Sequence, residues 1–341
     1  MSEVVDHLAE LTGFRDRDVL DVTLAGAFRD LLRPRSVAVY RVVGEGDELH
    51  WLTRARLTES DVVATADSVW VDLDQLPRRG DHAERCEALN GQTVITRVGG
   101  LGLNVFPLAT DREVVGVLEI VTDEPLDNEA QRLVCSILRI YRNFEGLLDY
   151  SERDTLTGLL NRKTFDESFL KISAKAPSQA AAGDARRASG PGSRYWLGMI
   201  DIDMFKSVND NFGHLIGDEV LLLLSRLMRS SFRFHDRLYR FGGEEFVALI
   251  RCDSEADAQG AFERLRQNTE SYTFPQVGKI TVSVGFSEVK AGDSPSSAIE
   301  RADRAVYYAK THGRNQVQSH ADLVGRGAID PNEKVGDVEL F

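Results

Sequence analysis

Two adjacent acidic residues follow a double glycine in the stretch RFGGEEF, residues 240–246. Apolar runs flank this stretch, and a Gly-Gly pair is a favoured connection of a β-hairpin because both glycines can adopt positive φ. The spacing therefore predicts a tight hairpin tip that holds Glu244 and Glu245 close to backbone N–H groups. Carboxylates placed in this way could bind a cation.

A second pair of acidic residues ends the apolar run YWLGMIDID, residues 195–203. Residues i and i+2 of a strand point to the same face, so we expect Asp201 and Asp203 to project together from a buried strand. If the hairpin lies beside this strand, Asp201 and Glu244 converge. Clustered carboxylates repel each other unless a cation lies among them, and oxygen ligands alone favour Mg²⁺ or Mn²⁺ over zinc. The alternative is that both acidic pairs are solvated strand ends.

The elements that must position these acids alternate along the second half of the chain. Apolar periodicity predicts strands at 195–203 and 279–289, a hairpin at 237–250, and helices at 217–232, 258–269 and 296–313. Gly313 is placed to end the last of these helices. The pattern predicts helices packed on a mixed β-sheet.

The first part of the chain, to about residue 125, has a different pattern. Two helical segments precede five strand patterns that are separated by Gly and Asp turns; the helices are expected at 4–14 and 21–32, and the strands at 36–43, 48–57, 92–98, 103–110 and 113–121. The order predicts an antiparallel α+β domain. The whole chain is therefore expected to be a two-domain protein, α+β in its first part and α/β in its second.

A long helix is predicted between the two domains, over residues 126–153. Its residues Val134, Ile137, Tyr141, Phe144 and Leu148 are spaced three and four positions apart, as in the seam of a coiled coil. A helix packed on its own domain satisfies the same spacing. The position between two domains favours a dimerising, signalling helix.

Two segments lack periodicity. Residues 173–194 are rich in Ala, Ser, Gly and Pro and are expected to form a flexible insertion. Residues 319–341 are polar and are expected to form a loosely ordered tail.

The composition excludes several classes of protein. With 42% hydrophobic and 28% charged residues over 341 positions, the chain is typical of a globular protein of two domains. No apolar run approaches the roughly 18 residues that a membrane helix needs, and the N-terminus lacks a signal-peptide pattern. We therefore expect a cytoplasmic protein without a membrane segment. The three cysteines are far apart and predict neither a disulfide framework nor a zinc site.

The formal net charge of -13 is unevenly spread. Residues 1–150 hold 27 Asp and Glu against 16 Arg and no Lys. This acidity predicts that the protein does not bind nucleic acid. A phosphate-rich small ligand would find its cations in the second half of the chain.

Four motifs in the second half occur together and in order. They are DTLTGLLNR (154–162), DIDMFKSVNDNFGHLIGDEV (201–220), RFGGEEF (240–246) and ADRAVYYAKTHGRNQ (302–316). Over about residues 151–317 the chain closely resembles the GGDEF family of diguanylate cyclases. The resemblance implies a palm-like, nucleotide cyclase-like domain over 154–318 that joins two GTP molecules into cyclic di-GMP and releases two pyrophosphates.

The resemblance implies a metal site for Mg²⁺ or Mn²⁺. Its ligands would be Asp201, the backbone carbonyl of Ile202 and Glu244, with Glu245 as a further ligand or outer support. Glu244 in place of the Asp of the family signature is a common variant and keeps the carboxylate. Glu244 would also assist deprotonation of the attacking ribose 3′-hydroxyl, and Lys206 would neutralise charge on the reacting triphosphate.

Substrate contacts are implied in the same way. Asn209 and Asp218 occupy the guanine positions of the family, with His214 near the same pocket. An Asp that accepts twice and an Asn amide suit the donors and acceptors of guanine. Lys310 and Arg314 match the β- and γ-phosphate contacts.

The motif RFHD adds an expected regulatory site. Arg233, Asp236 and Arg264 match the family's product-inhibition site for cyclic di-GMP. Because each domain holds one GTP and each 3′-hydroxyl attacks the other molecule, the resemblance also implies a homodimer. A catalytically silent receptor for GTP or cyclic di-GMP is the alternative, although silent members usually lose an acid of the signature.

The order of elements in the first part of the chain, with the hairpin pattern VFPLATDREVVGVLEI (105–120) near its end, resembles a GAF-type sensory domain, and a PAS-like domain is the alternative. The resemblance covers residues 1–125 and implies an unknown sensory ligand or protein partner.

Overall fold

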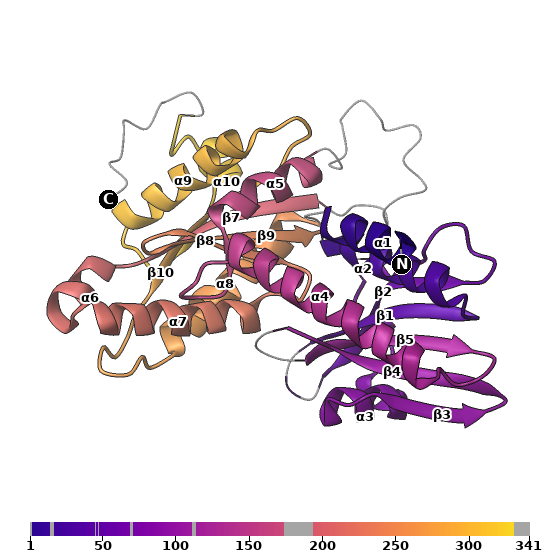
Figure 1. Ribbon diagram of the computed structural model, residues 1–341. Coiled ribbons are helices and arrows are strands. Elements are labelled where there is room, and N and C mark those ends of the chain that lie inside the picture. Colours follow the sequence, from indigo (N-terminus) through magenta and orange to yellow (C-terminus); the bar gives the residue numbers. More distant parts are fainter. Residues whose placement is uncertain are drawn as a thin grey trace. The chain divides into compact units, whose positions relative to one another are not determined.

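The computed structural model describes residues 2–13, 17–44, 46, 48–68, 71–110, 114–173 and 194–330. The chain divides into two compact units, Met1–Ser151 and Glu152–Phe341. Figure 1 labels their helices and strands. Most of the expected insertion and the last part of the expected tail lie outside the described residues.

The first unit is built on a five-stranded sheet in the order β2-β1-β5-β4-β3. Its strands are β1 (Ser36–Val43), β2 (His50–Thr58), β3 (Ile95–Gly99), β4 (Leu101–Ala109) and β5 (Val114–Thr122). Every neighbouring pair is antiparallel. The antiparallel α+β domain predicted from the sequence is therefore confirmed.

Helices cover both faces of this sheet. They are α1 (Ser2–Gly13), α2 (Arg17–Leu32), α3 (Ala83–Gly91) and α4 (Asn128–Glu152). Alternation along β1 sends Val37 and Val39 into the core under α1, α2 and α4, and Ala38 and Tyr40 into the core under α3. The sequence pattern did not predict α3, which is short and buries few apolar side chains.

The seam predicted on α4 packs inside the first unit. Val134, Ile137, Tyr141 and Leu148 are almost completely buried in the core of this unit, and Phe144 packs against it. The prediction that these residues form a dimerising coiled coil is therefore wrong. The alternative, a helix packed on its own domain, is confirmed because the same spacing also serves a sheet-facing stripe.

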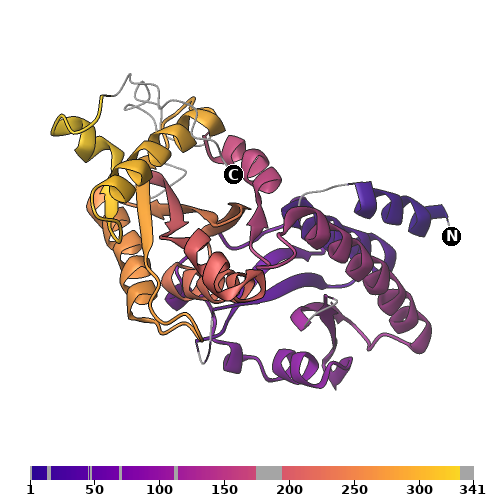
Figure 2. The same cartoon turned by 90° about the vertical axis from the view of Figure 1, so that its left-hand side faces the viewer.

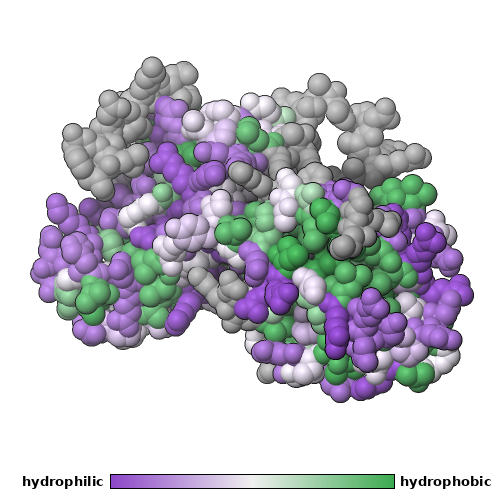
Figure 3. Space-filling view, in the orientation of Figure 1, coloured by the Kyte–Doolittle hydropathy of each residue, from purple (hydrophilic) through white to green (hydrophobic). Residues whose placement is uncertain are grey.

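The surface of the first unit still exposes large apolar side chains. Val5 of α1 and Leu147 and Tyr150 of α4 are each more than half exposed. In Figure 3, hydrophobic surface gathers around α1, α2 and α4.

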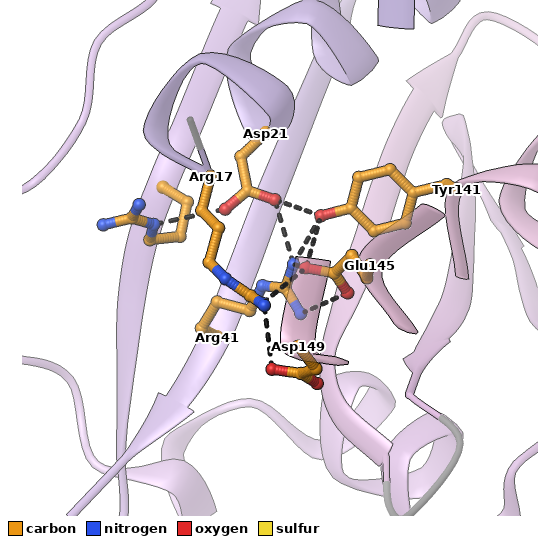
Figure 4. Close-up of polar contacts among 7 residues, drawn as sticks. Arg17, Asp21, Arg41, Tyr141, Glu145 and Asp149 are labelled. Atoms are coloured by element: carbon orange, nitrogen blue, oxygen red, sulfur yellow. Dashed lines mark hydrogen bonds and ion pairs between the residues drawn. The ribbon is translucent and has the colours of Figure 1, made fainter. Parts of the chain in front are cut away.

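Within the first unit, a network of charged residues joins the second half of α4 to α2 and β1 (Figure 4). Arg41 of β1 contacts Glu145 at 2.7 Å and Asp21 of α2 at 3.0 Å, and it also contacts the Tyr141 hydroxyl. Arg54 contacts the other Asp21 oxygen at 3.2 Å. Arg17 pairs with Asp149 at 2.8 Å, one turn beyond Glu145. Asp21 and Glu145 are each 2% exposed, so this network lies within the core.

The second unit contains a six-stranded mixed sheet in the order β11-β10-β7-β9-β8-β6. Its strands are β6 (Leu160–Asn161), β7 (Arg194–Ile202), β8 (Arg237–Gly242), β9 (Glu245–Cys252), β10 (Val282–Glu288) and β11 (Val317–Ser319). The central strand β7 is antiparallel to both β9 and β10. The predicted mixed sheet, with a hairpin beside the Asp201 strand, is confirmed.

Helices lie on both faces of this sheet (Figures 1 and 2). They are α5 (Arg162–Ser173), α6 (Phe205–Phe212), α7 (His214–Ser231), α8 (Glu255–Ser271), α9 (Pro295–Thr311) and α10 (His320–Gly325). Trp196 and Ile200 of β7 pack in the core with α7 and α8, whereas Leu197 and Met199 pack in the core with α5 and α9. Burial on both faces explains the continuous apolar run of β7.

The beginning of the expected loose tail is ordered. β11 pairs parallel with β10, α10 follows it, and Leu323 of α10 is fully buried. The prediction of a loosely ordered tail is therefore wrong for residues 319–325. Within the described ranges, no helix combines the length and apolar character needed to cross a bilayer.

Candidate active site

Asp201 reaches the site because of the alternation along β7. It follows Leu197 and Met199 on the face that packs against α9, and it is 5% exposed. Its backbone register places it between two strands, opposite Glu245 of β9 and Ser283 of β10. The apolar strand therefore carries a carboxylate to the end of the sheet.

The hairpin places two further carboxylates at the same end. Gly242 pairs with Glu245, and the register shifts before this pair, so Gly243 and Glu244 form the turn itself. Gly242 and Gly243 have φ of 154° and 49°. The tight tip is confirmed, but it lies one residue later than a Gly-Gly turn, which puts Glu244 at the tip and Glu245 in the strand.

Lys310 of α9 contacts this group directly. Its Nζ lies 2.7 Å from Asp201 Oδ2. The other oxygen, Asp201 Oδ1, is buried and finds no hydrogen-bond partner among the residues that the structure describes. A buried carboxylate oxygen in this state has capacity for a ligand.

The electrostatics of the group follow from burial and mutual repulsion. Burial raises the pKa of Asp201, Glu244 and Glu245, and the negative charge of Asp201 raises the pKa of both glutamates further. Lys310 acts in the opposite direction on all three. The predicted convergence of Asp201 with Glu244 is thus supported by their interaction.

A fourth carboxylate, which was not predicted from the sequence, belongs to this group. Burial raises the pKa of Asp303 on α9, and its charge in turn raises the pKa of Asp201 and Glu245. Asp303 precedes Lys310 by two helical turns and therefore shares its face. That spacing, an acid on the same side of a helix as a substrate-contacting lysine, was the signal that could have found it.

Asp203 does not join this group in the expected way. Its two oxygens accept hydrogen bonds from Thr281, Ser283 and the backbone of Asn315. Asp203 therefore has its own hydrogen-bond partners, although its charge still raises the pKa of Asp201, as expected for two carboxylates near the same strand end.

The donor set suits a magnesium-type cation that a nucleotide helps to bind. Within the described part of the chain, no three His, Cys, Asp or Glu side chains already form a group that could hold a metal ion. Mg²⁺ commonly takes only one or two protein carboxylates together with substrate phosphates. The unpaired oxygen of Asp201 and the neighbouring Glu244 fit that requirement.

The motif DTLTGLLNR contacts the hairpin through Arg240. The Arg240 guanidinium donates to both Asp154 oxygens, at 3.1 and 3.3 Å, and to the Gly243 carbonyl at 2.9 Å. Asp154 also accepts the backbone N–H and the hydroxyl of Thr157. Neither Arg240 nor Asp154 has a role predicted from the sequence.

The residues expected to read guanine lie on α6 and α7. A Cβ atom at Gly217 would lie 2.0 Å from Asn209 Oδ1, so the absence of a side chain lets Asn209 rest beside the start of α7. Asp218 follows directly and is exposed, as is His214 at the first position of α7. Lys206 on α6 and Arg314 after α9 are also exposed.

The three residues of the expected product site lie together. Asp236 accepts the backbone N–H of Arg233 at 2.9 Å, and the charges of Arg233 and Arg264 both act on it. Arg264 donates to the Ser231 carbonyl at 2.8 Å. Burial raises the pKa of Asp236 to about 6 in spite of these partners.

Comparison with known proteins finds relatives of the second part of the chain. Residues 151–316 match the family model described as diguanylate cyclase, GGDEF domain. The response regulator PleD of Caulobacter vibrioides is 33% identical over 221 residues, which cover 61% of this chain and 46% of PleD. The diguanylate cyclase VdcA of Vibrio cholerae is 34% identical over 198 residues, which cover 56% of this chain and 54% of VdcA.

One protein of solved structure is also similar to this chain in sequence. The GGDEF domain of DgcB from Caulobacter crescentus, in complex with c-di-GMP, is 32% identical, with a TM-score of 0.44 over 50% of this chain and 96% of that chain. The chain spans about half the length of the two curated relatives. Residues 151–316 of this protein therefore form a GGDEF diguanylate cyclase domain.

Proposed function

We propose that this protein is a diguanylate cyclase, which condenses two GTP molecules into cyclic di-GMP and two pyrophosphates. The observation that carries the proposal is the group at the end of the sheet: Asp201 with one buried, unpaired oxygen, beside Glu244, Glu245 and Lys310. Every acid of the signature is present, and no observation favours a receptor without activity.

The residues have separate roles in the proposed reaction. Asp201, the Ile202 carbonyl, Glu244 and Glu245 would hold Mg²⁺ or Mn²⁺, which supplies Lewis-acid stabilisation of the phosphate oxygens when it is bound. Glu244 takes the proton from the ribose 3′-hydroxyl. Its raised pKa brings this carboxylate closer to the ambient pH, as a general base requires.

The triphosphate needs cations to balance its charge. Lys310 and Arg314 would contact the β- and γ-phosphates, and Lys206 would neutralise charge that develops during transfer. In the structure Lys310 is paired with Asp201. This pair supports the proposal, because it puts the ammonium beside the carboxylates of the proposed metal site.

Selection of guanine would rest on Asn209 and Asp218, with His214 close by. The Asp218 carboxylate accepts from the N1–H and the exocyclic amine of guanine. Adenine lacks both donors at these places, so a bound adenine would leave that carboxylate unpaired.

The reaction requires two copies of the domain. Each 3′-hydroxyl attacks the α-phosphate of the GTP held by the other copy, so a homodimer with facing sites is part of the proposal. The seam residues of α4 do not supply its interface, because they are buried in the first unit.

Regulation is proposed at two places. Cyclic di-GMP would bind at Arg233, Asp236 and Arg264 and inhibit its own synthesis. The first unit would act as a GAF-like sensory domain for an unknown ligand or protein, in a cytoplasmic enzyme.

The test is direct. Purified full-length protein, first treated with an enzyme that degrades cyclic di-GMP to remove bound product, is incubated with GTP and Mg²⁺ and analysed by chromatography. Formation of cyclic di-GMP and pyrophosphate in a 1:2 ratio is the expected result. No product from protein that still binds GTP would contradict the proposal in favour of a receptor, unless removal of the first unit restores synthesis.

A further inference from the structure

Asp203 lies two residues beyond Asp201, yet three donors from distant parts of the second unit surround its carboxylate. Oδ1 accepts from the Ser283 hydroxyl at 2.6 Å. Oδ2 accepts from the Thr281 hydroxyl at 2.7 Å and from the backbone N–H of Asn315 at 3.0 Å. The residue is 8% exposed. Hydrogen bonds to a buried carboxylate are charge-assisted, so these contacts fix Asn315 firmly against the sheet.

The backbone around Asn315 has an uncommon conformation. Gly313, Arg314 and Asn315 have φ of 111°, 61° and 47°, so three consecutive residues lie in the left-handed region. A side chain makes this region costly, and such residues persist only when their surroundings fix them. The segment 313–315 therefore needs anchors that compensate for its strain.

Asp203 is one of a small number of anchors that hold this segment. The Asn315 side chain accepts from Arg266 at 2.8 Å and donates to Glu270 at 2.8 Å. The Arg314 N–H donates to the Ala309 carbonyl at 2.9 Å. Among these anchors, only Asp203 lies at the strand end that carries Asp201. Its carboxylate accepts the hydrogen bond of the peptide N–H that directly follows Arg314.

We infer that Asp203 is a positioning residue for the triphosphate. Its carboxylate fixes the left-handed segment and so determines where the Arg314 guanidinium, one turn after Lys310, meets the phosphates. The inference rests on the proposed function, because Arg314 acts on phosphates only if GTP is bound there. The two acids of the motif DID then have different roles. Asp201 lies at the reacting centre, and Asp203 orients the Arg314 side chain.

The test compares nucleotides that differ only in their phosphates. GTP and GMP are titrated by calorimetry into full-length protein that carries Glu244→Gln, which prevents turnover, with and without Asp203→Asn. The amide keeps the size of the side chain but cannot accept all three hydrogen bonds. We expect Asp203→Asn to raise the Kd for GTP about tenfold and to change the Kd for GMP by less than about twofold.

A double-mutant cycle identifies the residue through which Asp203 acts. In an Arg314→Ala background, Asp203→Asn is expected to weaken GTP binding by no more than about twofold, because the Arg314 guanidinium that Asp203 orients is already absent. Unchanged GTP binding, equal losses for GTP and GMP, or full additivity with Arg314→Ala would each overturn the inference.

One further variant and a separate activity measurement complete the test. If Asp203→Asn does not fold, Thr281→Val removes one donor to the same oxygen without changing size, and a selective loss of GTP affinity of about threefold is expected; no selective loss overturns the inference. The proposed function is judged separately, because it fails if protein with an intact Glu244 makes no cyclic di-GMP, whatever the binding data show.

Discussion

Arg240 and Asp154 are joined by a forked ion pair, with one guanidinium nitrogen 3.1 and 3.3 Å from the two carboxylate oxygens. The other nitrogens of the same guanidinium donate to the carbonyl of Gly243, in the turn that carries Glu244. Asp154 follows the last residue of α4 by two positions. Arg240 thus ties the turn that carries Glu244 to Asp154, near the beginning of the second unit.

Arg240→Lys is expected to lower kcat about tenfold or more, because one ammonium cannot bridge a carboxylate and a carbonyl as a guanidinium does. The measurement is the rate of cyclic di-GMP formation at saturating GTP. Arg301→Lys is a matched control, since Arg301 also bridges a carboxylate, of Asp293, and a carbonyl, of Glu288, outside the candidate site. Equal effects of the two substitutions would show that Arg240 serves stability alone.

Glu244→Gln is expected to reduce synthesis by at least about a hundredfold while the protein remains folded, because it removes charge without changing size. The rate is measured at saturating Mg²⁺ and GTP. Glu300→Gln, which alters an acid that pairs with Arg304 on α9, provides the control and should leave the rate unchanged. Retained turnover in Glu244→Gln would contradict the assignment of this residue as base and metal ligand.

Arg233→Ala is expected to relieve product inhibition and to raise the inhibition constant of cyclic di-GMP about tenfold or more, because a guanidinium that binds phosphate is lost. Initial rates are measured at increasing product concentration. Arg226→Ala removes an exposed arginine of α7 and is the control. An inhibition constant that does not change would mean that RFHD is only a surface motif.

Asp236 is expected to make the folded state less stable as the pH rises from about 4 to 6. Burial raises its pKa from 3.8 to about 6, so the folded protein keeps a proton that the unfolded chain releases near pH 4. The free energy of unfolding therefore falls over this interval, by on the order of 3 kcal/mol for a shift of this size. The group contributes its full stabilisation below pH 4.

The comparison of wild type with Asp236→Asn isolates this contribution. Burial lowers the pKa of His320 from 6.5 to about 4, which gives a slope of the opposite sign in the same interval. The difference between the two proteins cancels the histidine, and it should show that the Asp236-dependent decrease disappears in the variant. Parallel stability curves from pH 4 to 6.5, measured by urea denaturation, would contradict the expectation.

Arg41→Met is expected to destabilise the first unit by up to about 3–5 kcal/mol, because the buried Asp21 and Glu145 lose the guanidinium that they share and keep only Arg54 and Arg17 as partner cations. Hydrogen exchange of peptides from β1 and α4 in the full-length protein measures the loss. Arg35→Met is the matched control: Arg35 pairs with Asp123 and Glu59 on the surface, where such pairs contribute about 0–1 kcal/mol. Similar losses in the two variants would show that the buried network is not a special source of stability.

Strong periodicity explains what could be predicted from the sequence. The apolar run of β7, the hairpin and α9 each bury a continuous face, so local spacing was sufficient to find them. β6 and β11 are only two and three residues long and exist through pairing with strands that are distant in sequence. The local spacing of residues therefore cannot predict these two strands.

The candidate site was predictable to a similar extent. The motifs indicated Asp201, Glu244 and Lys310; the structure shows an ion pair between Lys310 and Asp201, and the charges of both shift the pKa of Glu244. Asp203 was assigned to the same face by its spacing, but its partners come from residues 281, 283 and 315 and could not be seen locally. The prediction of a coiled-coil seam on α4 was wrong for another reason. A helix that packs on a sheet and a helix that packs on a partner helix require the same apolar pattern. The chemical roles of all the expected site residues, including Lys206, His214 and Arg314, remain predictions.

The charged network behind α4 contains arginine as its only type of cation, and residues 1–150 contain no lysine at all. Guanidinium groups stay protonated at every physiological pH, and enzymes that acetylate lysine cannot act on them. Neither deprotonation at physiological pH nor lysine acetylation can therefore release α4 by neutralising a cation of this network. Because Arg41 contacts Asp21, Tyr141 and Glu145 at once, loss of its guanidinium would weaken three contacts around α4 together.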